Sequence, residues 1–256
     1  MSLQSIINSK EKFITSTLSK FDKAWDGTSF EVQKELINIF KRRDFDEAFI
    51  EQVFIKNGYD DLMELTASQF AKTVTFSRDI SKEVGYNFLL TPENKQLFGQ
   101  LNDMNFESLL NTKKQIANDL RRFAIESQLA QQSRAIIKRG FTDIFDNMGR
   151  RLNTEVNQGI RMSDEAINKF SYDNAGIELF QYIGPADGKT RGICLDTLSS
   201  QQNVKGFTTA QVEDSATPFI VRGGWNCRHS WVPFTDGYKP TIPSEKELAA
   251  DRNKGG

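Results

Sequence analysis

Proline is nearly absent from the first two thirds of this 256-residue chain, and its distribution constrains the fold more than any other feature. Pro92 is the only proline before residue 185, and five follow at Pro185, Pro218, Pro233, Pro240 and Pro243. Proline breaks helices because it lacks a backbone N–H and clashes with the preceding turn. We therefore expect an α+β fold, in which a mostly α-helical N-terminal body precedes a small α+β C-terminal module.

Apolar residues recur at helical spacings along the first 176 residues. One such face predicts a helix that ends near Gly27, and Ser29 predicts the N-cap of a second helix. Thr91 and Pro92 predict another helix start, since proline suits the first helical position. Between residues 105 and 170 the pattern is nearly unbroken, with Gly140, Gly149 and Gly159 as bends or helix ends. We expect six to eight helices.

The last 80 residues predict shorter elements. Residues 179–183 and 219–221 read as strands, a short helix begins at Thr208, and Trp231 to Pro233 follow a Cys-Arg-His segment. The charged, glycine-ended tail is expected to fray. We therefore divide the chain into a helical N-terminal region (1–104), a long-helix region (105–176), the α+β module (177–243) and a flexible tail (244–256).

Composition excludes several classes of function. Thirty-three basic and thirty-four acidic residues leave a net charge of −1, which argues against a chain that mainly coats nucleic acid or an anionic membrane. No apolar run approaches the roughly 20 residues that span a bilayer, and charges from Lys10 to Lys23 interrupt any signal-peptide core. One histidine and two cysteines leave few ways to build a catalytic triad. We expect a protein made in the cytoplasm, with no membrane partner and no enzymatic activity.

Cys194, Cys227 and His229 are the strongest chemical signal. In an extended segment Cys227 and His229 point to the same side, roughly 6.5 Å apart, which suits two ligands of one metal. The pattern predicts a candidate structural zinc site, with Asp187 or Asp196 as a fourth ligand. Two other interpretations stay open: a disulfide, which would stabilise the module by roughly 3 to 4 kcal/mol, or two free buried thiols.

The segment from Gly184 to Arg191 has the composition of a tight turn. Asp187 is suited to accept from the amides of Lys189 or Thr190, and Arg191 to pair with a carboxylate. Phosphate capture by Lys189 and Arg191 is the functional alternative. Because the glycine spacing matches neither a Walker A loop nor a dinucleotide fingerprint, the turn is the favoured interpretation.

Basic residues are concentrated between Lys113 and Arg161, where ten basic residues face five acidic ones. One interpretation is a nucleic-acid stripe. A solvated helix face with ordinary ion pairs is the favoured alternative. The candidate residues are Arg121, Arg122, Lys138, Arg139, Arg150 and Arg151.

The order of short motifs over residues 150–234 resembles the phage Mu F-like minor head proteins, the head-morphogenesis family. The resemblance begins with Thr154 and Glu155 in a helix, continues through a Tyr182-Ile183-Gly184 strand, Asp187, Thr190, Arg191 and Cys194, and includes Gly206 and Thr208. It ends with Gly223-Gly224-Trp225-Asn226-Cys227-Arg228-His229 before Pro233. Many members end in a His-Pro-Asn-Cys-Arg-Cys run, whereas here Gly224 and Trp225 hold the first two places and His229 holds the last.

The resemblance implies a structural role. Such a protein would be a minor capsid component of a bacteriophage virion, present in several copies at the portal vertex or capsid interior. Its partners would be the portal or major capsid protein, and packaged DNA as a further partner. The rival hypotheses are a toxin-like or enzymatic effector that uses Asp187, Arg191, Cys227 and His229, and a DNA-organising virion protein that uses residues 113–161.

Overall fold

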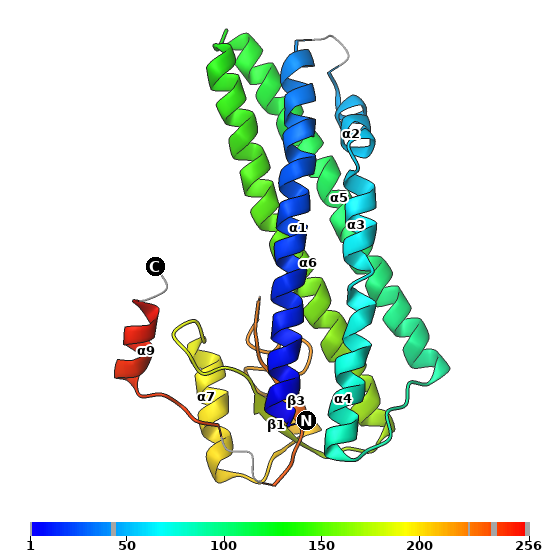
Figure 1. The fold of residues 1–256 in the computed structure, drawn as a ribbon, viewed down its shortest axis with the longest axis vertical. Helices are drawn as coiled ribbons and strands as arrows, with labels where there is room; N and C mark the ends of the chain where they lie inside the picture. Colours follow the sequence, from blue (N-terminus) through cyan, green and yellow to red (C-terminus); the bar gives the residue numbers. More distant parts are fainter. Residues whose placement is uncertain (1, 42–44, 225, 237–239, 254–256) are drawn as a thin grey trace. The chain divides into compact units, whose positions relative to one another are not determined.

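The computed structural model describes residues 2–41, 45–224, 226–236 and 240–253, and Figure 1 traces the chain through its elements. The chain divides into two compact units. Unit 1 comprises residues 1–13, 72–99 and 160–256, and unit 2 comprises residues 14–71 and 100–159. Both units are therefore assembled from segments that are distant in sequence.

Six α-helices precede the module in the described part of the chain, as expected. They are α1 (Leu3–Ile39), α2 (Glu47–Lys56), α3 (Tyr59–Ala67), α4 (Val74–Val84), α5 (Pro92–Leu129) and α6 (Arg134–Asn174), with a 3-10 turn, η1 (Phe70–Thr73), before α4. None of the helices in the described residues is long and apolar enough to cross a membrane.

The predicted break at Gly27 is wrong, because α1 continues to Ile39. Ser29 is not an N-cap; its hydroxyl donates to the carbonyl of Asp26 inside the helix. The buried side chains of Trp25, Val32 and Leu36 continue one apolar stripe past the glycine. Burial of that stripe outweighs the penalty of about 1 kcal/mol for one glycine inside a helix.

The start of α5 is confirmed at Pro92, where the Thr91 hydroxyl accepts from the amide of Asn94. The prediction that glycines bend or end the next helices is wrong, since Gly140, Gly149 and Gly159 all lie inside α6. A Cβ at these positions would stand 2.0 Å from Phe123, 2.5 Å from Trp25 and 2.8 Å from Phe70, respectively. The glycines therefore permit close packing against aromatic rings.

Unit 2 is a helical bundle with an apolar core. Its aromatic side chains contact each other, as in the edge-on pair of Phe54 and Tyr59, whose ring centroids lie 5.5 Å apart. The Tyr59 hydroxyl donates to the carbonyl of Leu109, which satisfies the one polar atom of that ring. The largest buried members of this core include Trp25, Phe54, Tyr59, Phe70, Phe141 and Phe145.

Unit 1 is built around a three-stranded antiparallel sheet with the order β2-β1-β3. Its strands are β1 (Leu179–Ile183), β2 (Phe207–Thr208) and β3 (Ser230–Pro233), and its short helices are α7 (Gly192–Ser200), α8 (Thr209–Glu213) and α9 (Glu245–Arg252), with the 3-10 turn η2 (Gln201–Asn203). Tyr182 of β1 pairs with Trp231 of β3. The predicted strand at 179–183, the segment at 231–233 and the helix after Thr208 are confirmed.

The structure differs from one prediction for the module and from one for the tail. Residues 219–221 form a turn instead of a strand, because Pro218 accepts from the amide of Arg222 and closes it. The tail is not unstructured over 245–252, where α9 begins with a capping box between Ser244 and Glu247. Residues 254–256 of the tail and Trp225 lie outside the described residues.

The packing also crosses the sequence boundaries that we drew at residues 104 and 176. Leu3, Ile6 and Ile7 of α1, Ile80 of α4 and Tyr172 of α6 pack in one core with the strands of the module. The module is therefore completed by the first residues of the chain.

Candidate metal centre

Two segments of unit 1 bring the two cysteines and the histidine together. Cys194 lies in the first turn of α7, and Cys227 and His229 lie in the extended segment before β3. The Sγ atoms of Cys194 and Cys227 are 3.8 Å apart, and Cys227 Sγ lies 3.6 Å from His229 Nδ1. All three ligand atoms lie within 4.8 Å of one another and all three residues are buried. The grouping predicted from the sequence is present.

The Cys194–Cys227 and Cys227–His229 spacings match the edges of a tetrahedral site. Zn–S bonds of about 2.3 Å and a Zn–N bond of about 2.0 to 2.1 Å put two sulfurs about 3.8 Å apart and a sulfur and a nitrogen about 3.5 Å apart. A disulfide needs its sulfurs at about 2.05 Å, and both cysteines are free thiols here. The observed distances thus fit a metal better than a disulfide.

Two glycines leave room for the cluster. A Cβ on Gly223 would stand 2.2 Å from Cys194 Sγ, and one on Gly184 would stand 2.3 Å from the His229 ring. A larger residue at either position would displace a sulfur or the imidazole. Gly223 was predicted only as a motif residue; its role is to let the backbone approach both thiols.

Tyr182 also belongs to the site, although the sequence did not predict it there. Its hydroxyl lies 3.4 Å from Cys227 Sγ and 3.6 Å from Cys194 Sγ. Its ring lies nearly parallel to that of His229, with an interplanar angle of 10° and centroids 5.0 Å apart. The available signal was its position in β1, opposite Trp231, but no spacing rule connects it to the cysteines.

The electrostatics distinguish the two thiols. The hydrogen bond from Cys194 lowers the pKa of Cys227, and the contact with His229 adds to this effect against the opposing effect of burial. The same pairing and burial raise the pKa of Cys194. Burial, followed by the charges of the two cysteines, raises the pKa of Tyr182, so its hydroxyl stays a donor. The anionic form of the pair therefore carries its charge on Cys227.

The predicted turn around Asp187 is present, and its carboxylate is fully engaged. It accepts from the amide of Lys189 at 3.0 Å, from the Thr190 hydroxyl at 3.1 Å and from both terminal nitrogens of Arg228. The hydrogen bond from Arg228 lowers the pKa of Asp187 to about 2. Asp187 is therefore used as a clamp on Arg228, and neither it nor Asp196 belongs to the metal-type group, contrary to the expected fourth ligand.

The guanidinium of Arg191 donates to the backbone carbonyl of Gly223. Although Arg191 is exposed, this bond joins the start of α7 to the loop beneath the two thiols. Gly224 and Asn226 of the same loop adopt left-handed backbone, with φ of 85° and 58°. Glycine and asparagine tolerate this conformation best.

A buried network of charges lies in the same unit and was missed by sequence reasoning. Lys10 Nζ lies 2.6 Å from Asp164, and Arg222 lies 3.3 Å from Glu165, with all four side chains 1% exposed or less. Arg222 also donates to the carbonyl of His229 at 3.1 Å. Burial raises the pKa of Glu165 to about 7 against the opposing charges of Arg222 and Lys10. Lys10 is 154 positions from Asp164, so no local sequence pattern predicts this ion pair.

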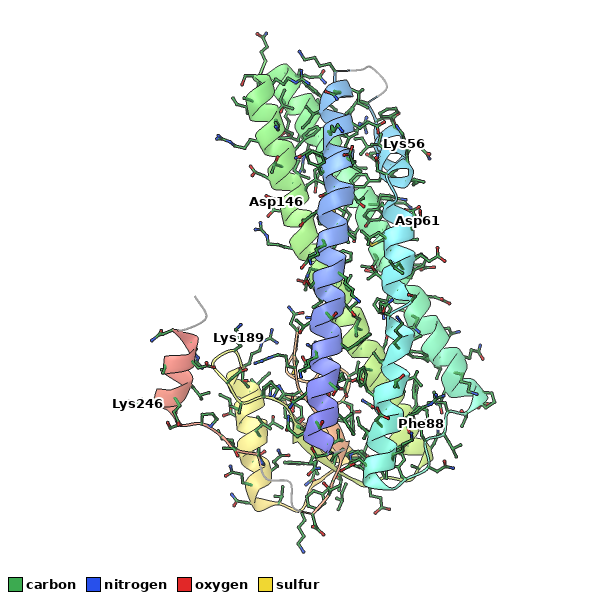
Figure 2. All side chains as sticks on the ribbon, viewed as in Figure 1. Lys56, Asp61, Phe88, Asp146, Lys189 and Lys246 are labelled. Atoms are coloured by element: carbon green, nitrogen blue, oxygen red, sulfur yellow. The ribbon has the colours of Figure 1, made fainter. Side chains whose placement is uncertain are left out.

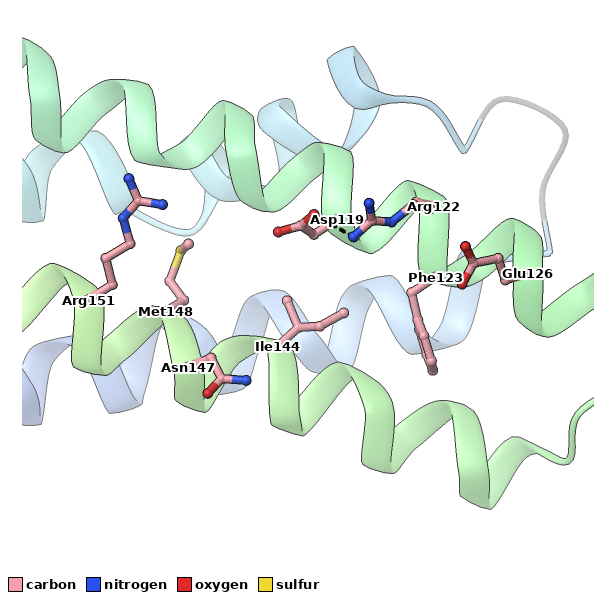
Figure 3. A pocket seen from close by; sticks show the side chains of 8 residues that line it. All are labelled: Asp119, Arg122, Phe123, Glu126, Ile144, Asn147, Met148 and Arg151. Atoms are coloured by element: carbon pink, nitrogen blue, oxygen red, sulfur yellow. Dashed lines mark hydrogen bonds and ion pairs between the residues drawn. The ribbon is translucent and has the colours of Figure 1, made fainter.

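The candidate nucleic-acid residues lie in unit 2 on α5 and α6. Arg121 pairs with Glu47 at 3.3 Å, Arg122 with Asp119 at 3.2 Å and Arg151 with Glu155 at 2.9 Å. Arg150 donates to Asn147, and Lys138 and Arg139 are exposed. Figure 3 shows Arg122 and Arg151 beside a pocket of about 380 Å³ between these helices, with the bond from Arg122 to Asp119 dashed. Much of the predicted basic stripe is thus neutralised by its own acidic neighbours.

Thr154 and Glu155 belong to unit 2 and do not take part in the cysteine and histidine cluster. The Thr154 hydroxyl donates to the carbonyl of Arg150, and Glu155 accepts from Arg151 and Thr112. They serve helix packing there.

Comparisons with protein-family models, curated proteins and solved structures find no match to this chain.

Proposed function

We propose that this chain is a minor structural protein of a phage head, which associates with the portal or the capsid interior during assembly. The observation that supports the proposal is spatial. Asp187, Thr190 and Arg191 come from one stretch that resembles the head-morphogenesis family, and Gly223 and Arg228 come from another. Hydrogen bonds connect the two stretches directly. The motif residues of the two stretches thus form one hydrogen-bonded cluster.

The contacts of these residues also favour a structural role. The Asp187 carboxylate holds Arg228, and Arg191 holds the Gly223 carbonyl, so the charged side chains tie the two stretches together. The backbone N–H of Gly188 donates to Asp251 of α9 at 2.7 Å, which attaches a third segment. A compact module secured in this way is suited to presenting a fixed surface to partner subunits.

Unit 2 offers apolar side chains for such partners. Leu129 is 80% exposed at the end of α5, and Ile136 is 51% exposed at the start of α6. Large contiguous apolar patches mark surfaces that contact other proteins, and these two side chains would contribute to such a patch at the turn between α5 and α6. We place the docking of a portal or coat subunit on this helical end.

The test is the location of the chain in particles. Heads purified by gradient sedimentation from the source of this chain should contain it in several copies, measured by quantitative mass spectrometry against the portal subunit. Arg228→Gln, which removes the clamp on Asp187, should lower its incorporation, whereas Lys205→Gln, an exposed change in the same module, should not. A chain recovered only in the unsedimented fraction would overturn the proposal.

Purified heads also distinguish the structural proposal from the rival hypothesis of a DNA-organising protein, when incorporation is compared with DNA binding. Binding to duplex DNA by exposed cations weakens steeply as salt rises, because each phosphate contact releases counterions. If Lys138→Gln with Arg139→Gln abolishes such binding and also prevents incorporation, the DNA role replaces the structural one. We expect incorporation to persist in this double variant.

A further inference from the structure

A pocket of about 260 Å³ in unit 1 opens onto the cysteine and histidine cluster. Its lining includes the three metal-type ligands, and three cationic side chains stand around them. These six residues are Cys194, Cys227, His229, Lys189, Arg191 and Arg228. Figure 2 labels Lys189 in the loop that precedes α7. The pocket thus combines a soft-metal donor set with positive charge.

We propose that Cys194, Cys227 and His229 bind one zinc-class ion and leave its fourth position open to a small oxyanion held in this pocket. The inference does not depend on a role in head assembly. Two sulfurs and an imidazole nitrogen select zinc-class ions over magnesium or calcium, which prefer oxygen ligands. Three protein ligands with a free fourth position are the pattern of an exchangeable site, whereas closed structural sites use four.

Neither of the carboxylates expected as a fourth ligand belongs to the ligand group. Both oxygens of Asp187 accept from Arg228, and Asp196 is exposed and outside the ligand group. Tyr182 approaches both sulfurs at hydrogen-bond distances of 3.4 and 3.6 Å, as a donor to thiolates does. Such a donor orients the sulfur ligands without occupying the metal. We therefore assign Tyr182 as a positioning residue.

The charge of the pocket determines what enters the fourth position. Two thiolates would neutralise a divalent ion, so the remaining field comes from the three cations. Arg228 is compensated by Asp187, and Arg191 is attached to a neutral carbonyl. No ion pair or hydrogen bond of the Lys189 ammonium is found among the described residues. The Lys189 ammonium leaves the pocket positive, which favours an anion over water or a neutral ligand.

The absorption spectrum of bound cobalt(II) tests both parts of the proposal: metal binding by the three ligands, and anion binding at the fourth position. The full chain, freed of metal under reducing conditions and loaded with Co²⁺, should give the thiolate charge-transfer and visible bands of a tetrahedral ion. Addition of inorganic phosphate should shift the visible bands, because the fourth ligand changes. Lys189→Gln should weaken phosphate binding several-fold with the same Co²⁺ spectrum, whereas the matched change Lys205→Gln should leave phosphate binding unchanged.

Further variants identify the ligands. Cys227→Ser should abolish the charge-transfer bands, and circular dichroism of that variant establishes whether it is folded. If Cys227→Ser does not fold, metal analysis of the wild-type chain purified with and without chelator provides the same answer. Tyr182→Phe should keep the phosphate response.

Three outcomes would overturn the inference. The first is a folded wild-type chain that binds no Co²⁺. The second is a Co²⁺ spectrum that phosphate does not change. The third is a phosphate response that appears only in Tyr182→Phe, since the phenol oxygen would then hold the fourth position. Each differs from the failure of the head-assembly proposal, which is measured in particles.

Discussion

The two units bury different kinds of side chain. The core of unit 2 is mainly aromatic and aliphatic, with glycines on α6 that accept aromatic rings at close range, and its buried Lys113 pairs with an exposed carboxylate, that of Asp60. Unit 1 buries Lys10, Asp164, Glu165 and Arg222 together with two thiols and a histidine. An apolar core tolerates changes in proportion to lost volume, whereas a core of paired charges depends on every partner being present. We therefore expect the core of unit 1 to be packed more specifically than that of unit 2, and to lose more stability when one of its residues is substituted.

The largest expected effect comes from removing one buried charge. Lys10→Met should lower the free energy of unfolding by about 3 to 5 kcal/mol, because Asp164 would lose its buried partner. The exposed pair of Lys34 and Glu31 provides the matched control, and Lys34→Met should cost less than about 1 kcal/mol. Urea denaturation monitored by circular dichroism measures both. Adding Asp164→Leu to Lys10→Met should restore much of the loss.

If Lys10→Met lowers the free energy of unfolding no more than Lys34→Met does, the proposed difference between the two cores is contradicted.

A cavity in the core of unit 2 should lower the free energy of unfolding by a similar or smaller amount. No second substitution of a charged residue should restore that loss. Leu152 of α6 is fully buried, and Leu152→Ala should cost roughly 2 to 5 kcal/mol. The loss should not depend on pH between 4 and 7, since the groups it exposes are apolar. The same urea series at several pH values checks this. A strong pH dependence would mean that unit 2 also depends on buried charges.

The Asp187 clamp should make the module sensitive to acid. The folded-state pKa of Asp187 is lowered from 3.8 to about 2 by Arg228, so its charged form stabilises the fold above pH 3.8. That stabilisation should decline as the pH falls from 3.8 towards 2, because the Asp187 carboxylate of the unfolded state binds a proton in this range while that of the folded state still resists it. Asp187→Asn should cost about 1 to 2 kcal/mol at neutral pH, since the clamp is partly exposed.

Thermal melts between pH 2 and 7 would measure the effect. The acid-induced loss of stability should be smaller in Asp187→Asn than in the wild type. Equal losses in both proteins would assign the acid sensitivity to other carboxylates.

The smallest effect is expected at the capping box of α9. The Ser244 hydroxyl accepts from the amide of Glu247, and Ser244→Ala should cost about 0.5 to 1 kcal/mol of helix stability. Hydrogen exchange over residues 245–252 should accelerate, while exchange in α6 stays unchanged. Unchanged exchange in α9 would show that its contact with Gly188, and not its cap, holds it in place.

The sequence by itself determined the elements whose signals are local. The start of α5 at Pro92, strand β1 at 179–183 and the short helix after Thr208 were all predicted, because caps and apolar periods act over three to seven residues. The convergence of Cys194, Cys227 and His229 was also anticipated, since few residues of these types exist in the chain. The capping box of α9 was readable in the same way but was missed.

Only the tertiary structure decided how distant segments pair. The continuity of α1 past Gly27, the division into two units and the pair of Lys10 and Asp164 depend on contacts between residues far apart in sequence. The same holds for Tyr182 beside the thiols and for Asp187, whose predicted role as a metal ligand is replaced by its pair with Arg228. A carboxylate has the same local signal whether it meets a metal or a guanidinium. Its partner is selected by the folded backbone, through burial and charge, and not by its neighbours in the sequence.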